Sequence, residues 1–282
     1  MTLPTTGEIA EALHQPELLS ATVIDSGQNN RILDTGQIIV RIPRHDEARS
    51  ELVREAAVLA VLAPRLPLPV PVPEVRTVGT YVVAVHRKLP GEPLLSLDGM
   101  HEAQRQELAR DLARFLRALH ALPLDILPPS APIDPMAEWR DLLAQLEAKA
   151  LPLLPAAVGK TIRDNFARFI GDVPAAPRTI THGDFGTGNI LVDNGKASGI
   201  IDFAGCGEGD PAYDLASLSA GLGDEFLALM APHYPGIAAM RDRIAFYRST
   251  FPLLDVLFGV DHDDAAALEA GLRSLTVDDV PA

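Results

Sequence analysis

The side chains best suited to chemistry gather in one short segment, Thr181–Asp214. Six of them surround its glycine-containing turns: His182, Asp184, Asn189, Asp202, Asp210 and Asp214. Phosphoryl transfer needs a group that orients the attacking hydroxyl, and oxygen ligands for the Mg²⁺ that bridges the phosphates. It also needs cations or amide donors that offset charge on the transferring group. A segment this rich in carboxylates and amides therefore indicates metal-assisted phosphoryl transfer.

Asp184 and Asn189 have the spacing that such a site requires. Only Phe-Gly-Thr-Gly separates them, and its two glycines favour a tight loop that brings both side chains together. Asp184 could then accept a hydrogen bond from the acceptor hydroxyl, while Asn189 offers an oxygen to Mg²⁺. Asp202 ends a predicted strand and can reach the same cation, since Mg²⁺ prefers oxygen ligands. Taken singly, each of the three is also an ordinary turn or cap residue, so the flanking motifs decide between the two interpretations.

The N-terminal third of the chain has the pattern of strands with one helix. Runs rich in Val, Ile and Tyr predict strands at Ala21–Asp25, Gln37–Ile42 and Thr80–His86. The first two strands are separated by a Gly/Asn turn, and apolar residues at helical spacing then predict a helix over Arg49–Leu62. The alternate prolines between Pro67 and Pro73 forbid a helix or a central strand, so we expect a docked, extended connector there.

The pattern changes at the turn Pro90–Pro93, after which helical stripes dominate. A hairpin interrupts them, with strands at Asn189–Val192 and Ala197–Asp202 joined by Asp-Asn-Gly. The sequence therefore predicts an α+β, bilobal fold: a small strand-rich lobe of residues 1–89 and a large helical lobe of residues 90–282 with an embedded hairpin. His120 and Trp139, on the helical stripes, have the simple interpretation of core or helix-surface residues.

The composition narrows the classes of partner. Lys and Arg number 24 against 38 Asp and Glu, a net charge of −14, which argues against nucleic-acid binding because phosphates need a basic face. The same acidity disfavours an anionic membrane surface and is compatible with a cationic small molecule, although a solvated acidic surface explains most of it more simply. A single cysteine, Cys206, excludes an intrachain disulfide, and no apolar run approaches the roughly 18 residues of a membrane span. We therefore expect a cytoplasmic protein without nucleic-acid or membrane partners.

Three linked motifs carry a family resemblance. HGDFGTGN at residues 182–189, followed by IIDFAG at 200–205, resembles the Brenner motif and the DFG-equivalent of the aminoglycoside and macrolide phosphotransferase family, which has a protein-kinase-like fold. GDPAYDLA at residues 209–216 matches the usual continuation of that family. The resemblance covers nearly the whole chain. It implies a nucleotide-binding N-terminal lobe, ATP or GTP as donor with Mg²⁺, and a helical lobe that holds the catalytic loop and a pocket for a small-molecule acceptor.

The resemblance also assigns roles to the positions that match its motifs. It implies that Asp184 is the catalytic aspartate and that Asn189 and Asp202 are the Mg²⁺ ligands. It implies structural support of the catalytic loop by His182, Asp210 and Asp214. Nucleotide-binding positions follow in the same way: Ser26, Gly27, Arg41, Glu55, Arg87, Lys88, Leu89 and Ile201. Within that set Glu55 resembles the αC glutamate, and residues 87–90 resemble the hinge that meets the nucleotide base.

Arg41 is a departure from the family pattern. The family usually has a lysine here, paired with the helical glutamate and touching the phosphates, whereas this strand has the sequence VRIPR at residues 40–44. Arginine keeps the charge and binds phosphate bidentately, but its guanidinium is larger and of fixed shape. A similar strand occurs in the macrolide and 2″-aminoglycoside branches. Arg44 is the competitor for the same role, and the two side chains face opposite sides of a regular strand.

The acceptor is less closely defined than the catalytic loop. Asp255, Asp261 and Asp264 lie where the family builds its acceptor pocket and could attract a polycationic aminoglycoside, or they belong to a solvated loop and helix face. Phe251 and Phe258 could line a pocket for a macrolide or fill the core. We expect a hydroxyl of an antibiotic, an aminoglycoside ahead of a macrolide, to receive the γ-phosphoryl group. A metabolic small-alcohol kinase and a nucleotide-binding pseudokinase are the alternatives, and only Arg41 favours the pseudokinase.

Overall fold

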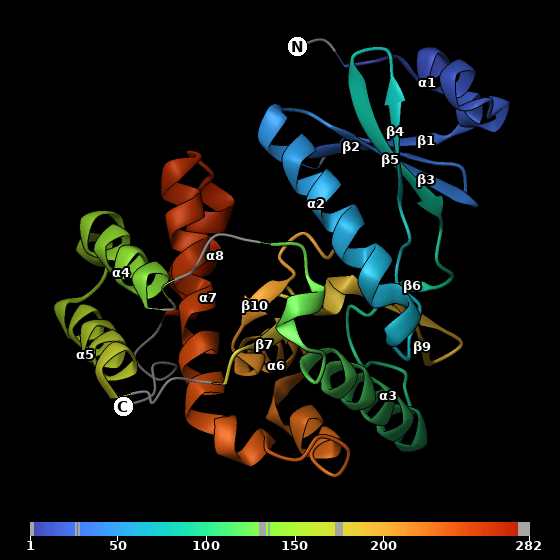
Figure 1. Cartoon of the computed structure of the whole chain (residues 1–282). Helices are drawn as coiled ribbons and strands as arrows, with labels where there is room; N and C mark the ends of the chain where they lie inside the picture. The colour runs from blue at the N-terminus through green and yellow to red at the C-terminus, as the bar shows by residue number, and fades with distance from the viewer. Residues whose placement is uncertain are drawn as a thin grey trace.

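The computed structural model describes residues 3–25, 27, 29–129, 134, 136–172 and 177–275. Its N-terminal part is a five-stranded antiparallel sheet in the order β1-β2-β3-β5-β4. The strands are β1 (Thr22–Ile24), β2 (Asn30–Asp34), β3 (Ile38–Pro43), β4 (Glu74–Val78) and β5 (Tyr81–Arg87). Two helices flank the sheet, α1 (Thr6–Leu13) and α2 (Asp46–Leu62), and α2 reaches from the sheet toward the helical part of the molecule (Figure 1).

Strand β3 shows how the sheet divides its side chains between two faces. Val40 and Ile42 are fully buried in a cluster that includes residues of α1, which covers this outer face. Arg41 lies between them and therefore points to the inner face, where it meets α2. No sequence pattern predicted α1, which begins with a capping box in which Thr5 and Glu8 bond each other's backbone N–H.

Helix α2 begins three residues before the predicted start at Arg49. His45 caps it, because its ring Nδ1 accepts the N–H of Ala48 at 3.2 Å. The buried face of the helix consists of alanine, valine and leucine, with one exception, Glu55, which is only 2% exposed. A carboxylate on an otherwise apolar buried face must be paired, so the fold itself draws attention to Glu55.

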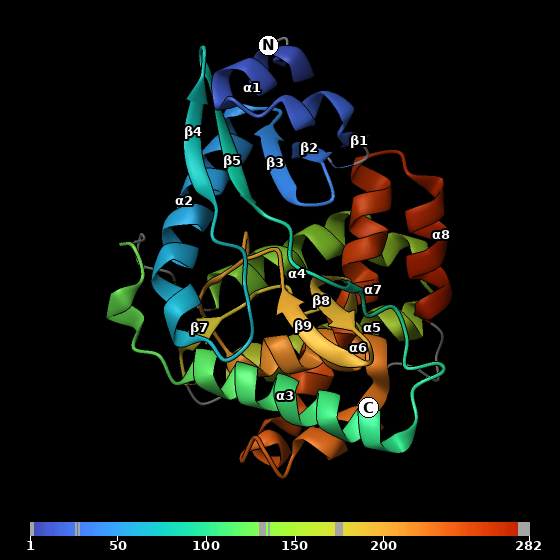
Figure 2. The same ribbon diagram turned by 90° about the vertical axis from the view of Figure 1, so that its right-hand side faces the viewer.

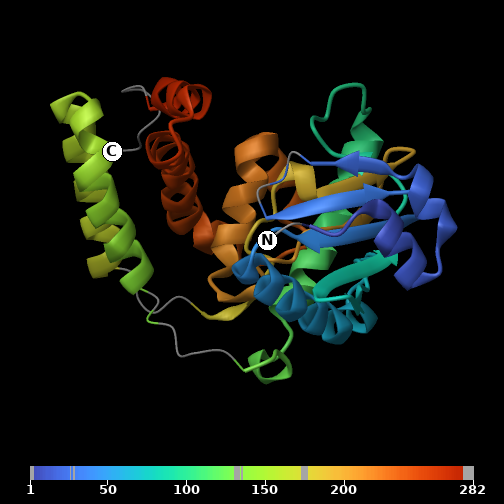
Figure 3. The same cartoon turned by 90° about the horizontal axis from the view of Figure 1, so that it is seen from above.

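The remainder of the described chain is mainly helical. Its helices are α3 (Glu102–His120), α4 (Ala137–Lys149), α5 (Ala156–Asp172), α6 (Pro211–Met230), α7 (Arg241–Asp261) and α8 (Ala265–Ser274). Short 3₁₀ helices lie at η1 (Pro16–Ser20), η2 (Ala63–Arg65), η3 (Leu124–Ile126), η4 (Leu151–Leu153), η5 (Thr187–Asn189) and η6 (Ile237–Met240). From above, the green-yellow helices α4 and α5 and the red helices α7 and α8 group on one side, opposite the blue sheet (Figure 3).

The predicted hairpin is present in the helical part. Strands β8 (Ile190–Asp193) and β9 (Lys196–Ile200) meet at a turn whose two central residues, Asn194 and Gly195, both have positive φ. β6 (Glu92–Pro93) extends this sheet, and β7 (Thr179–Thr181) pairs with β10 (Gly207–Gly209) nearby. The prediction placed the end of the second strand at Asp202, but β9 ends at Ile200. Asp202 has a φ of 64°, a left-handed conformation that does not continue a strand.

The Pro-rich connector docks as predicted. It has no helix or strand between residues 67 and 73, and the carbonyl of Pro69 accepts the N–H of Ile200 at 2.9 Å, on β9. The connector therefore ties the sheet-bearing part to the hairpin, as the side view shows (Figure 2). These features confirm the α+β, bilobal fold, whereas the boundary at residues 89 and 90 stays a prediction. Within the described ranges, no helix is both long and apolar enough to span a membrane.

Candidate active site

The loop after β7 brings Asp184 and Asn189 together. The side-chain Nδ2 of Asn189 donates to both the backbone oxygen and the carboxylate Oδ2 of Asp184, each at 2.9 Å. The loop can turn this sharply because Gly183 has a φ of 83°, and a Cβ at this position would lie 2.3 Å from the carbonyl oxygen of Gly205. Since the amide nitrogen of Asn189 is engaged, its side-chain oxygen is the atom left for a cation.

His182 braces this loop from inside the core. It is fully buried, its Nδ1 accepts the N–H of Asp184 at 3.2 Å, and its Nε2 lies 3.1 Å from the carbonyl oxygen of Ile201. An accepting Nδ1 and a donating Nε2 are the pattern of a neutral imidazole. Burial lowers the pKa of His182, against the charges of Asp214, Asp184 and Asp202, which raise it. The geometry is that of a positioning residue.

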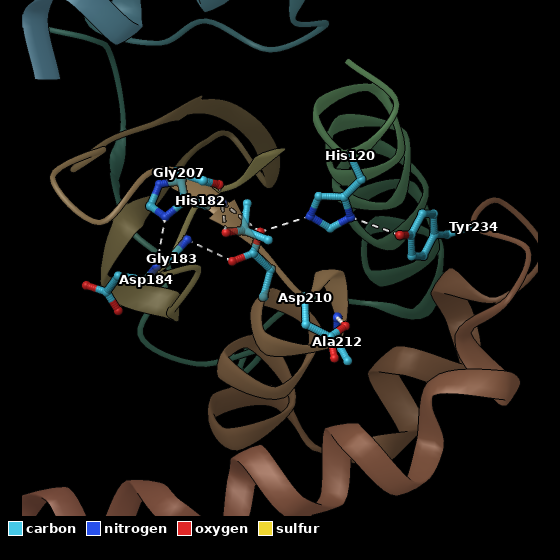
Figure 4. Close-up of polar contacts among 10 residues, drawn as sticks. His120, His182, Gly183, Asp184, Gly207, Asp210, Ala212 and Tyr234 are labelled. Carbon is cyan, nitrogen blue, oxygen red and sulfur yellow. Dashed lines mark hydrogen bonds and ion pairs between the residues drawn. The ribbon is translucent and has the colours of Figure 1, made fainter. Parts of the chain in front are cut away.

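Asp214, in α6, holds the same loop through its backbone. Its Oδ2 accepts the N–H of His182 at 2.8 Å and its Oδ1 accepts the N–H of Gly183 at 2.9 Å. His120 of α3 reaches Oδ2 through Nε2 at 2.9 Å, and its Nδ1 lies 2.9 Å from the hydroxyl of Tyr234, as the dashed lines in Figure 4 show. Burial raises the pKa of Asp214, but the hydrogen bond and charge of His120 and the contacts of His182 outweigh it, so the pKa is lowered.

His120 is a residue that sequence reasoning missed. We predicted a core or helix-surface residue, and the structure places it in a buried hydrogen-bond chain with Asp214 and Tyr234. The signal was available: His120 continues the buried stripe of α3, next to Leu119 and one turn after Leu116, and a buried imidazole needs polar partners. What the sequence could not supply was the identity of those partners.

Asp210 joins two helices of the same part. Its Oδ1 caps α6 by accepting the N–H of Ala212 at 2.9 Å, as the following proline suggested. Its Oδ2 accepts from Arg243 Nε at 2.7 Å and from the hydroxyl of Tyr247 at 3.0 Å, both in α7. Asp210 therefore fixes the start of α6, the helix that also carries Asp214.

Arg41 and Glu55 form the predicted pair on the inner face of the sheet. Arg41 Nη1 lies 2.6 Å from Glu55 Oε2, and Glu55 Oε1 accepts the N–H of Phe203 at 3.1 Å. Burial raises the pKa of Glu55, while the Arg41 charge acts to lower it. Arg44 does not compete for this carboxylate: it donates to the carbonyl oxygens of Gly27 at 2.9 Å and Asp25 at 2.6 Å. Arg44 thus holds the β1–β2 loop, whereas Arg41 faces α2 on the inner side of the sheet.

A second residue that the sequence did not single out is Arg54, beside Glu55 in α2. Both of its terminal nitrogens donate to the carbonyl oxygen of Cys206, at 2.9 and 2.8 Å. The two neighbours in α2 therefore clamp the segment that runs from Phe203 to Cys206. The Cys206 thiol itself is buried, which raises its pKa to about 12. A buried thiol of this kind is unreactive, as expected for a cysteine that takes no part in the chemistry.

The other predicted nucleotide positions lie along one edge of the two sheets. Lys88 donates its backbone N–H to the carbonyl of Gln37 at 2.8 Å and its ammonium to Asp34 at 2.7 Å. Leu89 packs against Gly199 of β9, where a Cβ would lie 2.7 Å from its side chain. Ile201 donates its N–H to the carbonyl of Asn189 at 2.9 Å. Arg87 ends β5 with an exposed side chain, and Ser26 lies outside the described residues.

The predicted acceptor carboxylates have different surroundings. Asp264 caps α8 by accepting the N–H groups of Ala266 and Ala267, and Asp261 pairs with Lys149 of α4 at 2.6 Å. Those two carboxylates are engaged in holding helices. Asp255, exposed on α7, has no ion-pair partner in the described ranges, and burial raises its pKa. Only Asp255 of the three therefore keeps a carboxylate available for a ligand.

An aromatic wall stands close to the catalytic loop. Trp139 of α4 lies 6.4 Å from Tyr213 of α6, and Phe251 of α7 lies 5.8 Å from the same tyrosine, measured between ring centroids. The pKa of Tyr213 is raised to about 12 by burial and then by the charges of Glu138 and Asp184. Tyr213 thus lies within electrostatic reach of the Asp184 carboxylate. The wall therefore combines inclined aromatic rings with nearby carboxylates.

The oxygen ligands fit a magnesium–nucleotide complex better than a protein-only metal site. No group of three or more His, Cys, Asp or Glu side chains gathers to hold a metal in the part of the chain that the structure describes. Asn189 and Asp202 offer hard oxygen donors, and Mg²⁺ is commonly bound by one or two protein ligands together with phosphates and water. The donor set is therefore suited to Mg²⁺ that arrives with a nucleotide.

Known proteins resemble this chain over most of its length. The profile of the phosphotransferase enzyme family matches residues 20–247. Viomycin phosphotransferase of Streptomyces vinaceus is 26% identical over 283 residues, which cover 96% of this chain and 98% of that protein. Homoserine kinase of Methylobacterium sp. (strain 4-46) is 36% identical over 108 residues, 38% of this chain and 33% of that protein. Among solved structures, the GDP and kanamycin complex of APH(2″)-IIIa superimposes with a TM-score of 0.86, at 19% identity and with 97% of each chain covered.

Proposed function

The chain belongs to the phosphotransferase enzyme family, and we propose that it transfers the γ-phosphoryl group of ATP or GTP to a hydroxyl of an antibiotic. The observation that carries the proposal is the contact between Asn189 and Asp184, a carboxylate and an amide held 2.9 Å apart on a loop that the core braces. A pair of this kind can orient a hydroxyl at one group and a cation at the other.

Asp184 is proposed to accept the hydrogen bond of the acceptor hydroxyl and to orient its oxygen toward the γ-phosphorus. It remains on a fixed loop because Asp214 and His182 hold the backbone N–H groups of His182, Gly183 and Asp184 itself. Positioning of this kind supplies much of the rate in phosphoryl transfer, because the protein contributes little covalent chemistry. The bond between the γ-phosphorus and the bridging oxygen of the donor breaks, and the nucleoside diphosphate leaves with that oxygen. The acceptor oxygen bonds to the γ-phosphorus, and its proton passes to the Asp184 carboxylate.

Asn189 and Asp202 are proposed to hold Mg²⁺, which when bound with the nucleotide offsets the negative charge of the phosphates. Asp202 has a left-handed backbone conformation, and the N–H of Phe203 beside it donates to Glu55 Oε1 at 3.1 Å. Arg41 is proposed to contact the phosphates, since the far side of its guanidinium still offers N–H donors in a fork. The contacts of Glu55 therefore fix the position of Arg41 relative to the segment that carries Asp202.

We propose a cationic antibiotic, an aminoglycoside ahead of a macrolide, as the acceptor. The net charge of −14 favours a cationic ligand, and the aromatic wall of Trp139, Tyr213 and Phe251 stands beside Glu138 and Asp184. Carboxylates beside aromatic rings suit a ligand that bears ammonium groups. The relatives named for viomycin and for a kanamycin complex support an antibiotic acceptor in general.

A metabolic small-alcohol kinase is the second candidate. The match to homoserine kinase favours it, because 36% is a higher identity than that to viomycin phosphotransferase, although it covers only 38% of the chain. The pseudokinase alternative loses support, since Arg41 makes the ion pair with Glu55 that its position requires.

The test is phosphate transfer from ATP and from GTP, with Mg²⁺, across viomycin, hygromycin B, kanamycin, a macrolide and homoserine. We expect turnover of at least one cationic antibiotic with a low Michaelis constant. Purified Asp184→Ala protein run in parallel controls for contaminating kinases, because it shares the preparation but lacks the proposed carboxylate. Turnover of homoserine, with no turnover of any antibiotic, would favour the metabolic small-alcohol kinase instead.

A further inference from the structure

A cavity of about 1070 Å³ opens on the outer face of the sheet, behind residues 87–89. Its apolar lining includes Leu13 at the end of α1, Ile38 at the start of β3 and Val85 near the end of β5. Helix α1 lies over this end of the sheet next to β3 and β5 (Figure 2). The volume is at the upper end of the range of about 300–1,000 Å³ typical of small-molecule sites.

The cavity and the proposed nucleotide site lie on opposite faces of the sheet. Val85 pairs with Val40, which belongs to the outer cluster under α1, whereas Arg41 is the next residue and faces α2. Ile38 and Val85 pack against that outer cluster from the cavity side. A molecule in the cavity therefore lies on the other face of the sheet from Arg41, although the cavity shares residues 87–89 with the predicted hinge.

The charged side chains on the wall favour an anion. Arg87 is exposed at the end of β5 and makes no ion pair with the described residues, while Arg76 of β4 pairs with Glu74. Lys88 also borders the cavity, although its ammonium is held by Asp34. Cations thus outnumber carboxylates on this wall, in a chain whose net charge is −14. Only Arg87 offers an uncommitted guanidinium, which binds carboxylate, sulfonate or phosphate groups bidentately.

We propose that this cavity binds a small amphipathic anion. Its apolar body lies on Leu13, Ile38 and Val85, and its acidic group meets Arg87. The apolar lining matches the body of such a ligand, and Arg87 matches its negative charge. A cation lacks the charge that Arg87 requires, and an uncharged sugar lacks both the charge and the apolar body. The inference does not depend on phosphoryl transfer, because it concerns a surface that the catalytic groups do not share.

The probe is 8-anilinonaphthalene-1-sulfonate, which combines an apolar body, one N–H donor and a sulfonate. Its fluorescence is titrated with the full chain in the presence of saturating Mg²⁺ and a nucleotide, so that the inner cleft is closed to it. We expect saturable binding of one probe per chain. Arg87→Gln and, independently, the rim variant Val72→Glu weaken it by about tenfold, because each removes positive charge or adds negative charge beside the sulfonate.

Arg114→Gln is the matched control. It removes the same charge from an exposed position on α3, and its dissociation constant is expected to equal that of the unchanged protein. Arg87 and Val72 are exposed, so their variants should fold, which melting temperature and circular dichroism verify. Absence of saturable binding, displacement of the probe by nucleotide, or equal affinity in Arg87→Gln and Arg114→Gln would each overturn the proposal.

Discussion

Arg41 Nη1 lies 2.6 Å from Glu55 Oε2, and the second oxygen of Glu55 accepts the N–H of Phe203 at 3.1 Å. One buried carboxylate thus connects the sheet, helix α2 and the residue that follows Asp202. Burial raises the pKa of Glu55, and the arginine charge counters that rise. Removal of either partner would leave the other charge without its counterpart in a poorly solvated place.

Replacement of Arg41 by Met is expected to lower the free energy of unfolding by about 3 kcal/mol. The side chain of Glu55 is only 3% exposed, and its buried carboxylate would lose the cation that pairs with it. Arg41→Lys should recover most of that loss, since an ammonium can still pair with one oxygen. Arg76→Met is the control, because Arg76 and its partner Glu74 are both more than half exposed and the loss there should stay below about 1 kcal/mol. Urea denaturation measures all three, and equal losses at positions 41 and 76 would contradict the assignment.

Asp184→Asn is expected to reduce kcat by about 100-fold or more, since a side chain that accepts a proton typically contributes that much. The amide is nearly the same size as the carboxylate, so Mg²⁺ and nucleotide should still raise the melting temperature as in the unchanged protein. Asp193→Asn is the matched variant: it removes a carboxylate from the exposed hairpin turn and should leave kcat alone. A fully active Asp184→Asn protein would remove Asp184 from its proposed role.

Contacts between residues close in sequence could be predicted from the chain. Asp184 and Asn189 are five positions apart, and the glycines between them allow only a tight loop. Arg41 and Glu55 are fourteen apart, yet a strand followed at once by a helix limits where they can meet. The hairpin was predictable for the same reason, because Asn-Gly at its tip requires positive φ at both residues.

Contacts between distant segments were not predictable in this way. His120 meets Asp214 from 94 residues away, and Arg54 meets the carbonyl of Cys206 from 152 residues away. Neither contact leaves a local periodicity, and the partner of Arg54 is a backbone atom that every residue type possesses. The acceptor carboxylates were uncertain for the opposite reason: an aspartate such as Asp264 caps a helix as readily as it binds a cation.

Acid should destabilise the protein partly through His182. Burial lowers the pKa of His182, so below its ordinary value of about 6.5 the unfolded chain takes up a proton that the folded chain refuses. Its contribution to stability is thus fully present above about pH 6.5 and is lost as the pH falls toward the lower pKa of the folded state.

Substitution of His182 measures how much of the loss of stability in acid comes from this residue. His182→Gln keeps a donor and an acceptor but cannot titrate, so its free energy of unfolding should fall less steeply between about pH 7 and 5, by up to 1.4 kcal/mol per pH unit. Some slope should remain, because burial also lowers the pKa of His86. Exposed His262→Gln should keep the full slope. Urea titrations at several pH values decide, and identical slopes in both variants would show that His182 does not titrate with unfolding.

Gly183 and Gly36 offer a test of why the catalytic loop needs glycine. Both have φ near 84°, at 83° and 84°, so alanine at either position meets a similar backbone cost of about 1 kcal/mol. A Cβ at Gly36 meets nothing within 4 Å, whereas one at Gly183 would lie 2.3 Å from the carbonyl oxygen of Gly205. Gly183→Ala must therefore push apart the loop that carries Asp184 and the segment that follows Asp202.

We expect Gly36→Ala to keep its kcat. Its free energy of unfolding, measured by urea denaturation, should fall only by the backbone cost of about 1 kcal/mol. Gly183→Ala should lose at least twice as much stability, and its kcat should fall by more than about tenfold, because a displacement of about 1 Å at a reacting group already has a large effect on rate. The fall in kcat should persist at temperatures where circular dichroism shows Gly183→Ala fully folded. Equal behaviour of the two alanine variants would mean that the loop and the Gly205 segment can separate without consequence, and that their close contact does not position Asp184.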